Sequence, residues 1–299
     1  MSNTENKYSL SSWITLLVLA VVWGSSYILM KKGLVVFQPM QMASLRIGFA
    51  FITMMWIALF NLKKIPRKKL KIILLAGLIG NFFPAYLYAF AQTHVNSSLA
   101  GIFNSLTPLF TLLIAVTAFR VKVTGLQITG IMLGFLGCVG LSMVNSTGGF
   151  GNINLYVILI VIATILYGIN INLIKSKLSD IDSLLMTSCA MMFIGPFAIV
   201  YLVTTDFVTV ITETPGGWEA LGYVALLGIT GTALALFFFN RLIQNTGPVF
   251  ASMVTYLMPV VAVLWGVIDG EEIFPLHFVG MALIIFGVYL TNRRVRQSN

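Results

Sequence analysis

The sequence predicts an all-α integral membrane protein whose ten transmembrane helices form two inverted five-helix repeats. Three observations predict this: an apolar composition, ten long apolar runs and an internal duplication. Of the 299 residues, 58% are hydrophobic and only 9% are charged, whereas an ordinary soluble domain is about 25% charged. So few charged residues cannot give a soluble protein a wettable surface. A lipid bilayer solvates apolar side chains, and we expect it to surround the folded chain.

Ten runs are apolar and long enough to cross a bilayer, which takes about 20 residues of helix. They are apolar on all sides and lack the alternation of strands in a membrane β-barrel. The first run has no small-residue cleavage site and ends in Lys31 and Lys32, which favours an uncleaved first helix over a signal peptide. The runs cover residues 13–31, 39–61, 70–92, 96–118, 124–144, 154–174, 183–204, 218–242, 246–269 and 275–292.

The charged residues indicate the orientation of these helices. Ten spans place both termini on one side, and the cytoplasmic loops of membrane proteins are enriched in Lys and Arg. With both termini in the cytoplasm, fifteen of the 18 Lys and Arg residues fall on the inner side. Six of the nine acidic residues fall on the outer side. We therefore expect a multi-pass protein of the cell inner membrane with cytoplasmic N- and C-termini.

The chain also aligns with itself. Residues 77–108 match residues 228–259 without a gap, which places Gly77 on Gly228. The first helices of the two halves match at a slightly different shift. Further matched pairs are Ala100 with Ala251, Leu106 with Leu257, Pro108 with Pro259, Trp23-Gly24 with Tyr167-Gly168, Gly130 with Gly280 and Gly137 with Gly287. The order and spacing are kept over five spans, so the chain divides into repeats at residues 1–149 and 150–299.

An odd number of spans per repeat turns the second repeat upside down in the membrane. The loop charges agree with this inversion, because the loop after the fourth span carries Arg120 and Lys122, whereas the matching loop after the ninth span carries three acids. Inverted repeats are the architecture of many secondary transporters, in which two equivalent arrangements exchange to give alternating access. The duplication therefore favours a transporter.

Several short motifs occur in a fixed order along the ten spans. They are Trp23-Gly24-Ser25-Ser26, Leu45-Arg46, Ser98-Leu99-Ala100, Leu106-Thr107-Pro108, Ala251-Ser252, Leu257-Met258-Pro259, and Gly270-Glu271 followed by Pro275, Gly280, Leu283-Ile284 and Gly287. With these motifs the chain resembles the EamA-like branch of the drug/metabolite transporter superfamily over nearly its whole length. One departure is Arg120, where the family often has an acid, so a family role that needs this acid is in doubt.

The resemblance implies a central cavity lined by the first four helices and by helices six to nine, with helices five and ten at the periphery. It also implies small metabolites as substrates, often amino acids or drugs moved outward. Export of amino acids or related compounds is therefore the expected activity. An uptake permease, an exchanger and a channel stay open as alternatives, although no ring of like residues or carbonyl filter marks a channel.

Polar side chains in the middle of the spans are candidate substrate contacts, because hydrocarbon holds no water and these groups must pair or face a cavity. Asn104 and Thr255 occupy matching positions four residues before the paired prolines, and Asn81 matches Thr232. Hydrogen bonding between helices, worth about 0.6–2 kcal/mol per contact, is the alternative role. The candidates are Asn81, Asn104, Thr107, Asn170, Thr232 and Thr255, with Asn172 and Thr230 at similar depth.

Arg46 is the charged residue placed clearly within a span, where an Arg costs about 2.5–3.5 kcal/mol. It either meets a substrate carboxylate in the cavity or holds the second helix in place, and the structural role is favoured. Pro108 and Pro259 each remove a backbone donor from a helix. They either gate the cavity as bends or form static kinks.

Four aromatic residues are candidates for the wall of an apolar pocket, although most such side chains pack or face lipid. They are Trp23, Tyr86, Tyr167 and Tyr256. Gly130-x-x-x-Gly134 and Gly266-x-x-x-Gly270 allow close contact between helices. A homodimer is therefore one use of these motifs, which also occur by chance in glycine-rich spans.

Other chemistries lack their motifs. His94 and His277 have no ligand partners at suitable spacing, Cys138 and Cys189 lie singly in apolar runs, and no metal or cofactor is expected. The net charge of +9 reflects membrane topology and does not indicate nucleic acid binding. No enzyme motif or phosphate-binding loop appears. All acids lie in loops or at helix ends, so we expect a facilitator or exchanger, or a carrier coupled weakly through groups at the helix ends such as Glu271.

Overall fold

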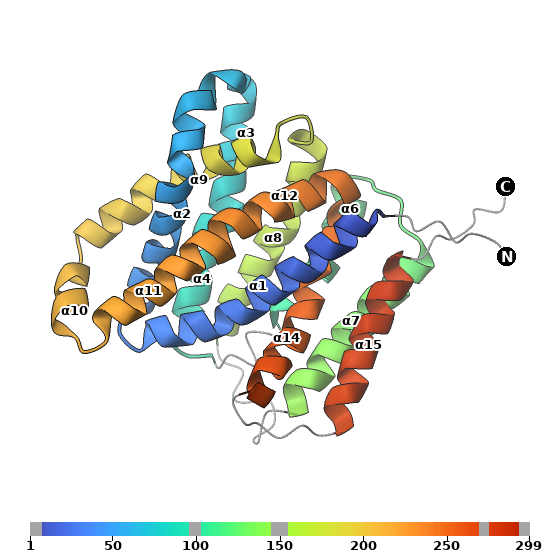
Figure 1. Ribbon diagram of the computed structural model, residues 1–299. Coiled ribbons are helices and arrows are strands. Elements are labelled where there is room, and N and C mark those ends of the chain that lie inside the picture. Colours follow the sequence, from blue (N-terminus) through green and yellow to red (C-terminus); the bar gives the residue numbers. More distant parts are fainter. Residues whose placement is uncertain (1–7, 96–102, 145–154, 269–274, 293–299) are drawn as a thin grey trace.

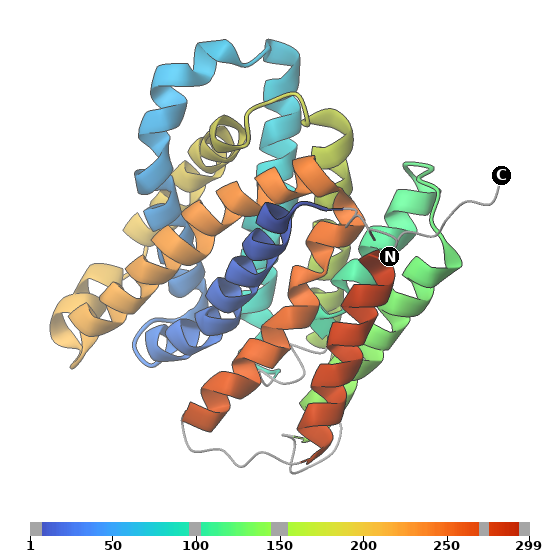
Figure 2. The same ribbon diagram turned by 45° about the vertical axis from the view of Figure 1, so that its right-hand side comes forward.

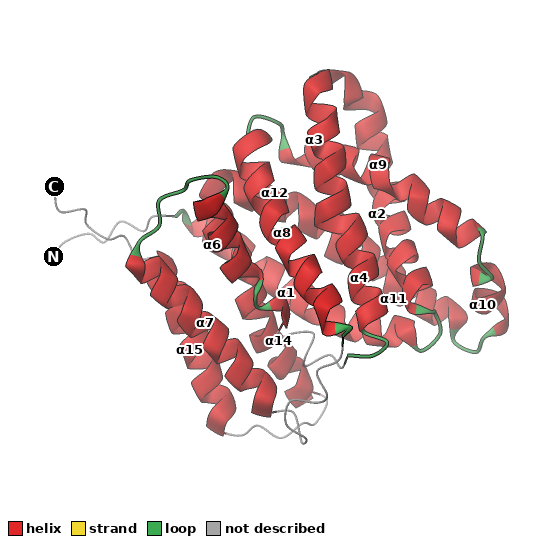
Figure 3. Cartoon of the chain, turned by 180° about the vertical axis from the view of Figure 1, so that it is seen from behind, coloured by secondary structure: helices red, strands yellow, loops and turns green. Residues whose placement is uncertain are grey.

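The computed structural model describes residues 8–95, 103–144, 155–268 and 275–292, which form helices and turns without a strand among them (Figures 1 and 3). The α-helices are α1 (Leu10–Leu34), α2 (Pro39–Asn61), α3 (Arg67–Gly77), α4 (Phe83–Ala91), α6 (Thr107–Thr117), α7 (Gly125–Val144), α8 (Val157–Lys177), α9 (Ser183–Val203), α10 (Phe207–Glu213), α11 (Gly217–Gly228), α12 (Ala235–Thr246), α13 (Pro248–Ser252), α14 (Val254–Ile268) and α15 (Pro275–Asn292). A 3₁₀ turn, η1 (Leu62–Lys64), extends α2. Two π-helical segments, η2 (Leu78–Phe82) and η3 (Ile229–Leu234), join α3 to α4 and α11 to α12.

Six of the predicted spans coincide with helices that are long and apolar enough to cross a membrane. These are Leu10–Leu34, Pro39–Lys64, Arg67–Ala91, Val157–Lys177, Ser183–Val203 and Gly217–Thr246. The fourth, fifth, ninth and tenth predicted spans contain shorter apolar helices within the described residues. The chain is thus an all-helical membrane protein, while the total of ten spans stays a prediction.

Two connections differ from the sequence prediction. The link between the seventh and eighth spans contains a short helix, α10, which the hydropathy pattern did not predict. The link between α12 and α13 is a single residue, Gly247, with φ 108° and ψ 171°. Side chains disfavour this backbone conformation, so glycine allows the chain to leave one helix and enter the next at once.

The two halves pack into one another with approximate twofold symmetry. The first helix of the first repeat, α1, contacts α11, α12 and α14, and its counterpart α8 contacts α3, α4 and α6. A side chain added at Gly24 would meet Val261, and one added at Gly168 would meet Phe110. Val261 and Phe110 are related by the same shift that aligns Gly77 with Gly228. Equivalent helices therefore meet through equivalent residues across the repeats.

Helices α7 and α15 form a separate pair at the edge of the bundle, as the resemblance implied (Figures 1 and 2). Their glycines face one another, since a Cβ on Gly130 would lie 2.6 Å from the Gly287 carbonyl and one on Gly137 would lie 2.8 Å from the Gly280 carbonyl. The first predicted glycine motif thus serves contact within the chain. Gly270 of the second motif lies outside the described residues, and a homodimer stays a prediction.

We predict that Gly287→Ala destabilises the protein, because its Cβ would lie 2.5 Å from both the Gly130 carbonyl oxygen and the Gly134 amide nitrogen. Overpacking of this kind typically costs about 1–3 kcal/mol. Thermal unfolding of the detergent-solubilised protein, followed by circular dichroism, measures the effect. Gly140→Ala on α7 is the matched control, since nothing lies within 4 Å of its Cβ, and alanine favours a helix. A wild-type melting temperature for Gly287→Ala would contradict close α7–α15 packing.

Candidate functional site

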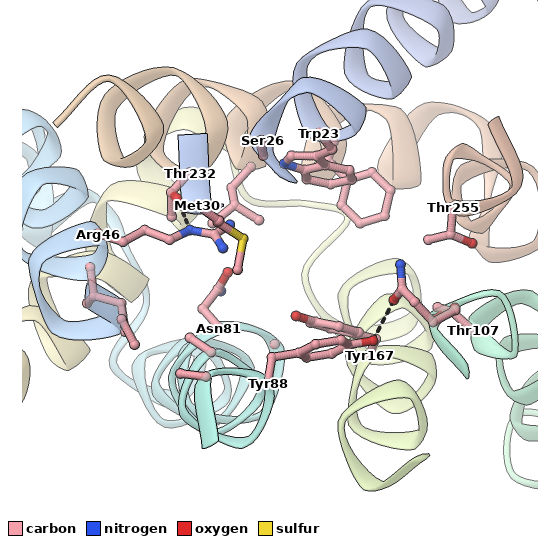
Figure 4. A pocket seen from close by; sticks show the side chains of 18 of the residues that line it. Trp23, Ser26, Met30, Arg46, Asn81, Tyr88, Thr107, Tyr167, Thr232 and Thr255 are labelled. Carbon is pink, nitrogen blue, oxygen red and sulfur yellow. Dashed lines mark hydrogen bonds between the residues drawn. The ribbon is translucent and has the colours of Figure 1, made fainter. Parts of the chain in front are cut away.

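Residues of both repeats line a cavity of about 180 Å³, and Figure 4 shows it from close by. Its wall combines apolar side chains with a small number of polar groups, which is usual for a small-molecule site. The wall comes from α1, α2, η2–α4, the turn before α6, α8, η3–α12 and α14. Its polar and aromatic members are Trp23, Ser26, Arg46, Asn81, Tyr88, Gln92, Asn104, Thr107, Tyr167, Asn170, Thr232, Phe239, Asn240 and Thr255.

The cavity brings together nine of the eleven predicted substrate contacts. They are Trp23, Arg46, Asn81, Asn104, Thr107, Tyr167, Asn170, Thr232 and Thr255. They come from seven of the predicted spans and from both repeats, as pseudo-symmetric polar groups at mid-depth should. The seventh span, α9, contributes no residue to this wall and packs behind α2 instead. The wall therefore differs there from the one that the resemblance implied.

Tyr86 and Tyr256 lie elsewhere. The Tyr86 hydroxyl is 2.5 Å from Ser44 Oγ, and its ring packs against Phe82 between α4 and α2. Tyr256 is fully buried under α7, where its hydroxyl donates to the Ile131 carbonyl at 2.9 Å. Both tyrosines join helices and do not line the cavity. They point away from it because a helix turns by about 100° per residue, so the neighbour of a cavity residue faces another side.

Sequence analysis missed Ser26, Tyr88, Gln92 and Asn240. Helical spacing could have found the first three. On the third span, Tyr88 and Gln92 follow Asn81 by seven and eleven residues, which is the repeat of a single helix face. On α1, Ser26 follows Trp23 by three residues. A pattern search that started from each predicted polar residue would have extended the site along these faces.

The π-helical segments place three residues in the cavity wall: Gly80 and Asn81 from η2, and Thr232 from η3. The segments occupy matching positions in the two repeats. In a π-helix, each amide donates to the carbonyl five residues earlier, as the Phe83 amide does to the Leu78 carbonyl. Single π turns inside α-helices occur frequently at functional sites. Here they interrupt the third and eighth spans where these face the cavity.

Two side chains from the first repeat are bound to η3. The Trp23 indole Nε1 donates to the Gly231 carbonyl at 2.8 Å. The Arg46 Nε donates to Thr232 Oγ1 at 2.6 Å, as Figure 4 shows. Arg46 therefore both joins α2 to η3 and lines the cavity. The two roles that sequence analysis set against each other are compatible in this geometry.

The fourth and ninth spans are broken where they meet the cavity. Pro108 is the second residue of α6 and cannot donate to the Asn104 carbonyl, which accepts from Thr107 Oγ1 at 2.7 Å instead. The ninth span breaks at Met253, between α13 and α14, and Pro259 lies inside α14. Discontinuous helices of this kind form the substrate sites of many transporters. A gating role for either proline stays a prediction.

Aromatic rings form the middle of the wall. Tyr88 and Tyr167 lie nearly parallel, with ring centroids 6.3 Å apart and planes 28° apart (Figure 4). The Tyr88 hydroxyl donates to Asn104 Oδ1 at 2.8 Å, which fixes the ring and the amide together. The ring of Trp23 packs edge-on against Phe239 at 4.9 Å. These contacts hold an apolar, aromatic surface open between polar ends.

Within the described residues, the cavity wall extends to one end of the bundle. Its wall extends along α1 to Met30 and Leu34, along α2 to Met42, and along the third span to Gln92. Leu34 is the last residue of α1, and Gln92 directly follows α4. Towards the other end, the wall stops near the middle of the helices, at Trp23 on α1 and Asn240 on α12. Among the described residues the wall does not continue to this second end, which we call the closed end.

The residues at the closed end are the repeat equivalents of the residues that line the cavity at the other end. The shift that places Gly24 on Gly168 places Met30 on Ile174 and Leu34 on Leu178. The shift that places Gly77 on Gly228 places Gln92 on Ile243. The side chains of Ile174, Leu178 and Ile243 are exposed by only 2%, 0% and 0% and belong to the largest apolar cluster.

Hydrogen bonds hold the closed end together. Gln244 Nε2 donates to the carbonyls of Leu178 and Ile181 at 2.9 Å each, and Lys175 Nζ donates to the Gln244 carbonyl. On the surface beside them, Lys69 and Asp180 form an ion pair at 2.9 Å. The hydrogen bond from Lys69 lowers the pKa of the Asp180 carboxyl below its usual value. We call these bonds the inner clasp.

Two further points of the sequence analysis, on Glu271 and on metal binding, do not concern the cavity. Glu271, the residue predicted for coupling, lies outside the described residues. Within the described part of the chain, no three His, Cys, Asp or Glu side chains come together as metal ligands would. Both cysteines, Cys138 and Cys189, are buried free thiols.

Comparison with known proteins places this architecture in a family. The chain matches the EamA-like transporter family twice, over residues 11–143 and again over residues 154–293. The chain belongs to the EamA-like transporter family. The two matched segments are the two repeats, and the resemblance drawn from the motifs is confirmed.

Individual relatives match more than nine tenths of the chain. The "Uncharacterized inner membrane transporter YedA" of Escherichia coli K12 is 29% identical over 286 residues, which cover 92% of this chain and 88% of that protein. An "Uncharacterized transporter" of Archaeoglobus fulgidus is 26% identical, covering 95% of this chain and 100% of that protein. A crystal structure at 16% identity shares the fold, with a TM-score of 0.76 over 95% of this chain and 96% of the other.

Proposed function

We propose that this chain is a secondary transporter that exports small metabolites, most often amino acids or related compounds, across the inner membrane by alternating access. Membership of a transporter family supports transport in general. The observation that carries the mechanism is the central cavity, which both repeats line and which reaches one end of the bundle while the inner clasp seals the other. Enzymatic chemistry is not part of the proposal.

The positive-inside rule supplies the direction of this opening. The inner clasp lies at the end that carries the basic residues around α3 and the end of α8, such as Lys69, Lys175 and Lys177. With this end in the cytoplasm, the cavity faces outward. YedA is named as an inner membrane transporter, and we propose the same membrane here, with both termini cytoplasmic.

The repeat symmetry supplies the second state of the transport cycle. Exchanging the conformations of the two repeats would bury Met30, Leu34 and Gln92 against one another and expose their equivalents at the inner clasp. Alternating access by exchange of inverted repeats needs this kind of paired surface. A continuous channel is disfavoured, because the equivalents at the closed end are almost completely buried.

The cavity suits a small polar metabolite. Its volume of about 180 Å³ is below the roughly 300–1,000 Å³ of sites for drug-sized ligands. Arg46 supplies a positive charge, and no Asp or Glu lies in the wall within the described part of the chain, which favours substrates with a carboxylate. Uptake or exchange would use the same cavity in the opposite direction, so the assay must distinguish direction.

We predict that expression of the chain protects bacteria against inhibitory amino acids, amino-acid analogues or toxic metabolites of one chemical class. Asn104→Leu should abolish the protection, because it removes the amide that Tyr88 binds at the cavity wall. Growth across a panel of such compounds is the measurement, with immunoblots of the membrane fraction to show that the variant is present.

Increased sensitivity to one compound would contradict export and indicate uptake, to be measured as import of the radiolabelled compound. Equal protection by wild type and Asn104→Leu would place the substrate site away from this cavity.

We predict that Met30→Cys reacts with a membrane-impermeant thiol reagent applied from the periplasm, whereas Ile174→Cys is protected. The native cysteines are buried and should react slowly. Gln244→Leu removes the two hydrogen bonds that the Gln244 side chain makes in the inner clasp, each worth roughly 0.5–1.5 kcal/mol. It should lower the ratio of outward-facing to inward-facing protein by about fivefold or more and so reduce the labelling of Met30→Cys. Gln127→Leu is the matched control, since Gln127 bonds locally to Thr124. Unchanged labelling in Gln244→Leu would show that the clasp does not hold this state.

We predict that transport is not coupled to protons, since none of the described residues that line the cavity is acidic. Substrate added to sealed vesicles that contain the protein should cause flux without a change of internal pH, and Glu271→Gln should transport like the wild type. A substrate-linked pH change that disappears in Glu271→Gln would contradict this and assign coupling to that carboxylate.

A further inference from the structure

The Asn170 side chain has a buried acceptor without a partner. Asn170 lies on α8 in the cavity wall and is 8% exposed. Among the side chains that the structure describes, its Oδ1 is the buried polar atom that makes no hydrogen bond. A buried acceptor left in this state costs roughly as much as a broken hydrogen bond. Unsatisfied groups of this kind are rare in native proteins and call for an explanation.

The fold offers this amide no partner because of its position against η2. A Cβ on Gly80 would lie 2.0 Å from Asn170 Nδ2, so the amide lies directly over the glycine backbone. By contrast, Asn172 on the same helix donates to the carbonyls of Thr111 and Gly168, at 2.9 Å each. Helix α8 therefore carries one asparagine that is committed to the structure and one that is not.

The repeat symmetry also distinguishes Asn170 from its equivalent in the first repeat. The equivalent of Asn170 in the first repeat is Ser26, which also lines the cavity and lies 3.0 Å from the Cβ position of Gly231, the equivalent of Gly80. The Ser26 hydroxyl is satisfied within its own helix, by donation to the Val22 carbonyl at 2.8 Å. Of these two equivalent polar groups, the Ser26 hydroxyl is satisfied within its own helix, whereas Asn170 Oδ1 remains available to a ligand.

We propose that Asn170 Oδ1 accepts a hydrogen bond from the ammonium group of a zwitterionic substrate whose carboxylate lies towards Arg46. This deepens the proposed export function and rests on it. The terminal torsion of an asparagine is broad, so the amide can turn into the cavity when a donor arrives. Among the residues that the structure describes, the cavity wall holds the charge of Arg46 and no acid, so a neutral amide oxygen is the acceptor available to the ammonium. The faces of Tyr88 and Tyr167 add a favourable surface for a cation.

Stability gives the first test, because it needs no substrate. In the purified protein, Asn170→Leu keeps the shape of the side chain and removes the unsatisfied acceptor, and we expect its melting temperature to rise by about 2–4 °C. The matched variant Asn172→Leu breaks two hydrogen bonds and should melt at a lower temperature. If Asn170→Leu also lowers the melting temperature, Asn170 is a structural residue and the inference is wrong.

Ligand discrimination gives the second test. L-amino acids, the carboxylic acids that lack their amine and the amines that lack their carboxylate are each added to the purified protein, and binding is measured by thermal stabilisation. We expect the wild type to prefer the amino acids by about tenfold, as one hydrogen bond allows. Asn170→Leu should lose this preference, and Asn170→Asp, which keeps an acceptor oxygen, should retain it.

These outcomes separate the inference from the function on which it rests. Export that persists together with equal binding of amino acids and their desamino acids would overturn the role of Asn170 and leave export intact. A complete absence of export and of binding by all three compound classes would overturn both the proposed function and the inference.

Discussion

Backbone hydrogen bonding in a medium without water is the constraint on which the rest of this structure depends. In hydrocarbon, each amide and carbonyl must find a partner inside the protein, so irregular backbone is tolerated where it is enclosed by protein or lines a cavity. The irregular segments here obey this rule. The π segments η2 and η3 and the break before α6 meet at the central cavity, and Trp23 and Thr107 satisfy two of the carbonyls concerned. The cavity is thus where the fold can hold polar groups at depth.

The same constraint explains the periphery. Helices α7 and α15 are regular and meet through glycines whose backbones approach closely. Their outer faces are exposed and apolar, as at Leu136 and Phe286. A lipid-facing pair of this kind needs no polar side chain for its packing, because van der Waals contact between small residues drives helix association in a bilayer. Polar residues are therefore free to gather between the remaining helices.

Composition and periodicity predicted most of the fold and part of the site. The helix bounds followed from apolar length, so α2 and α15 begin and end where the hydropathy changes. Asn81, Asn104, Thr232 and Thr255 were found because repeat symmetry and depth mark them together. Tyr86 and Tyr256 could not be excluded from the cavity, since depth alone does not show which way a helix faces. The π segments could not be recognised in the sequence, because they share no marker residue. Pro84 lies beside η2, but η3 has no matching proline.

Differences between the repeats give the two ends of the bundle different contacts, which would favour one of the two states of the proposed transport cycle. A symmetric sequence would give both ends of the bundle equal stability. Here Gln244 bonds the carbonyls of Leu178 and Ile181 across the inner end, whereas its equivalent, Thr93, bonds within its own turn. In the proposed cycle, two hydrogen bonds of about 0.5–1.5 kcal/mol each bias the outward-facing state. A substrate can reverse a bias of this size only by binding the two states with a matching difference in affinity. An asymmetric acceptor such as Asn170, set against the satisfied Ser26, is a physical source for that difference.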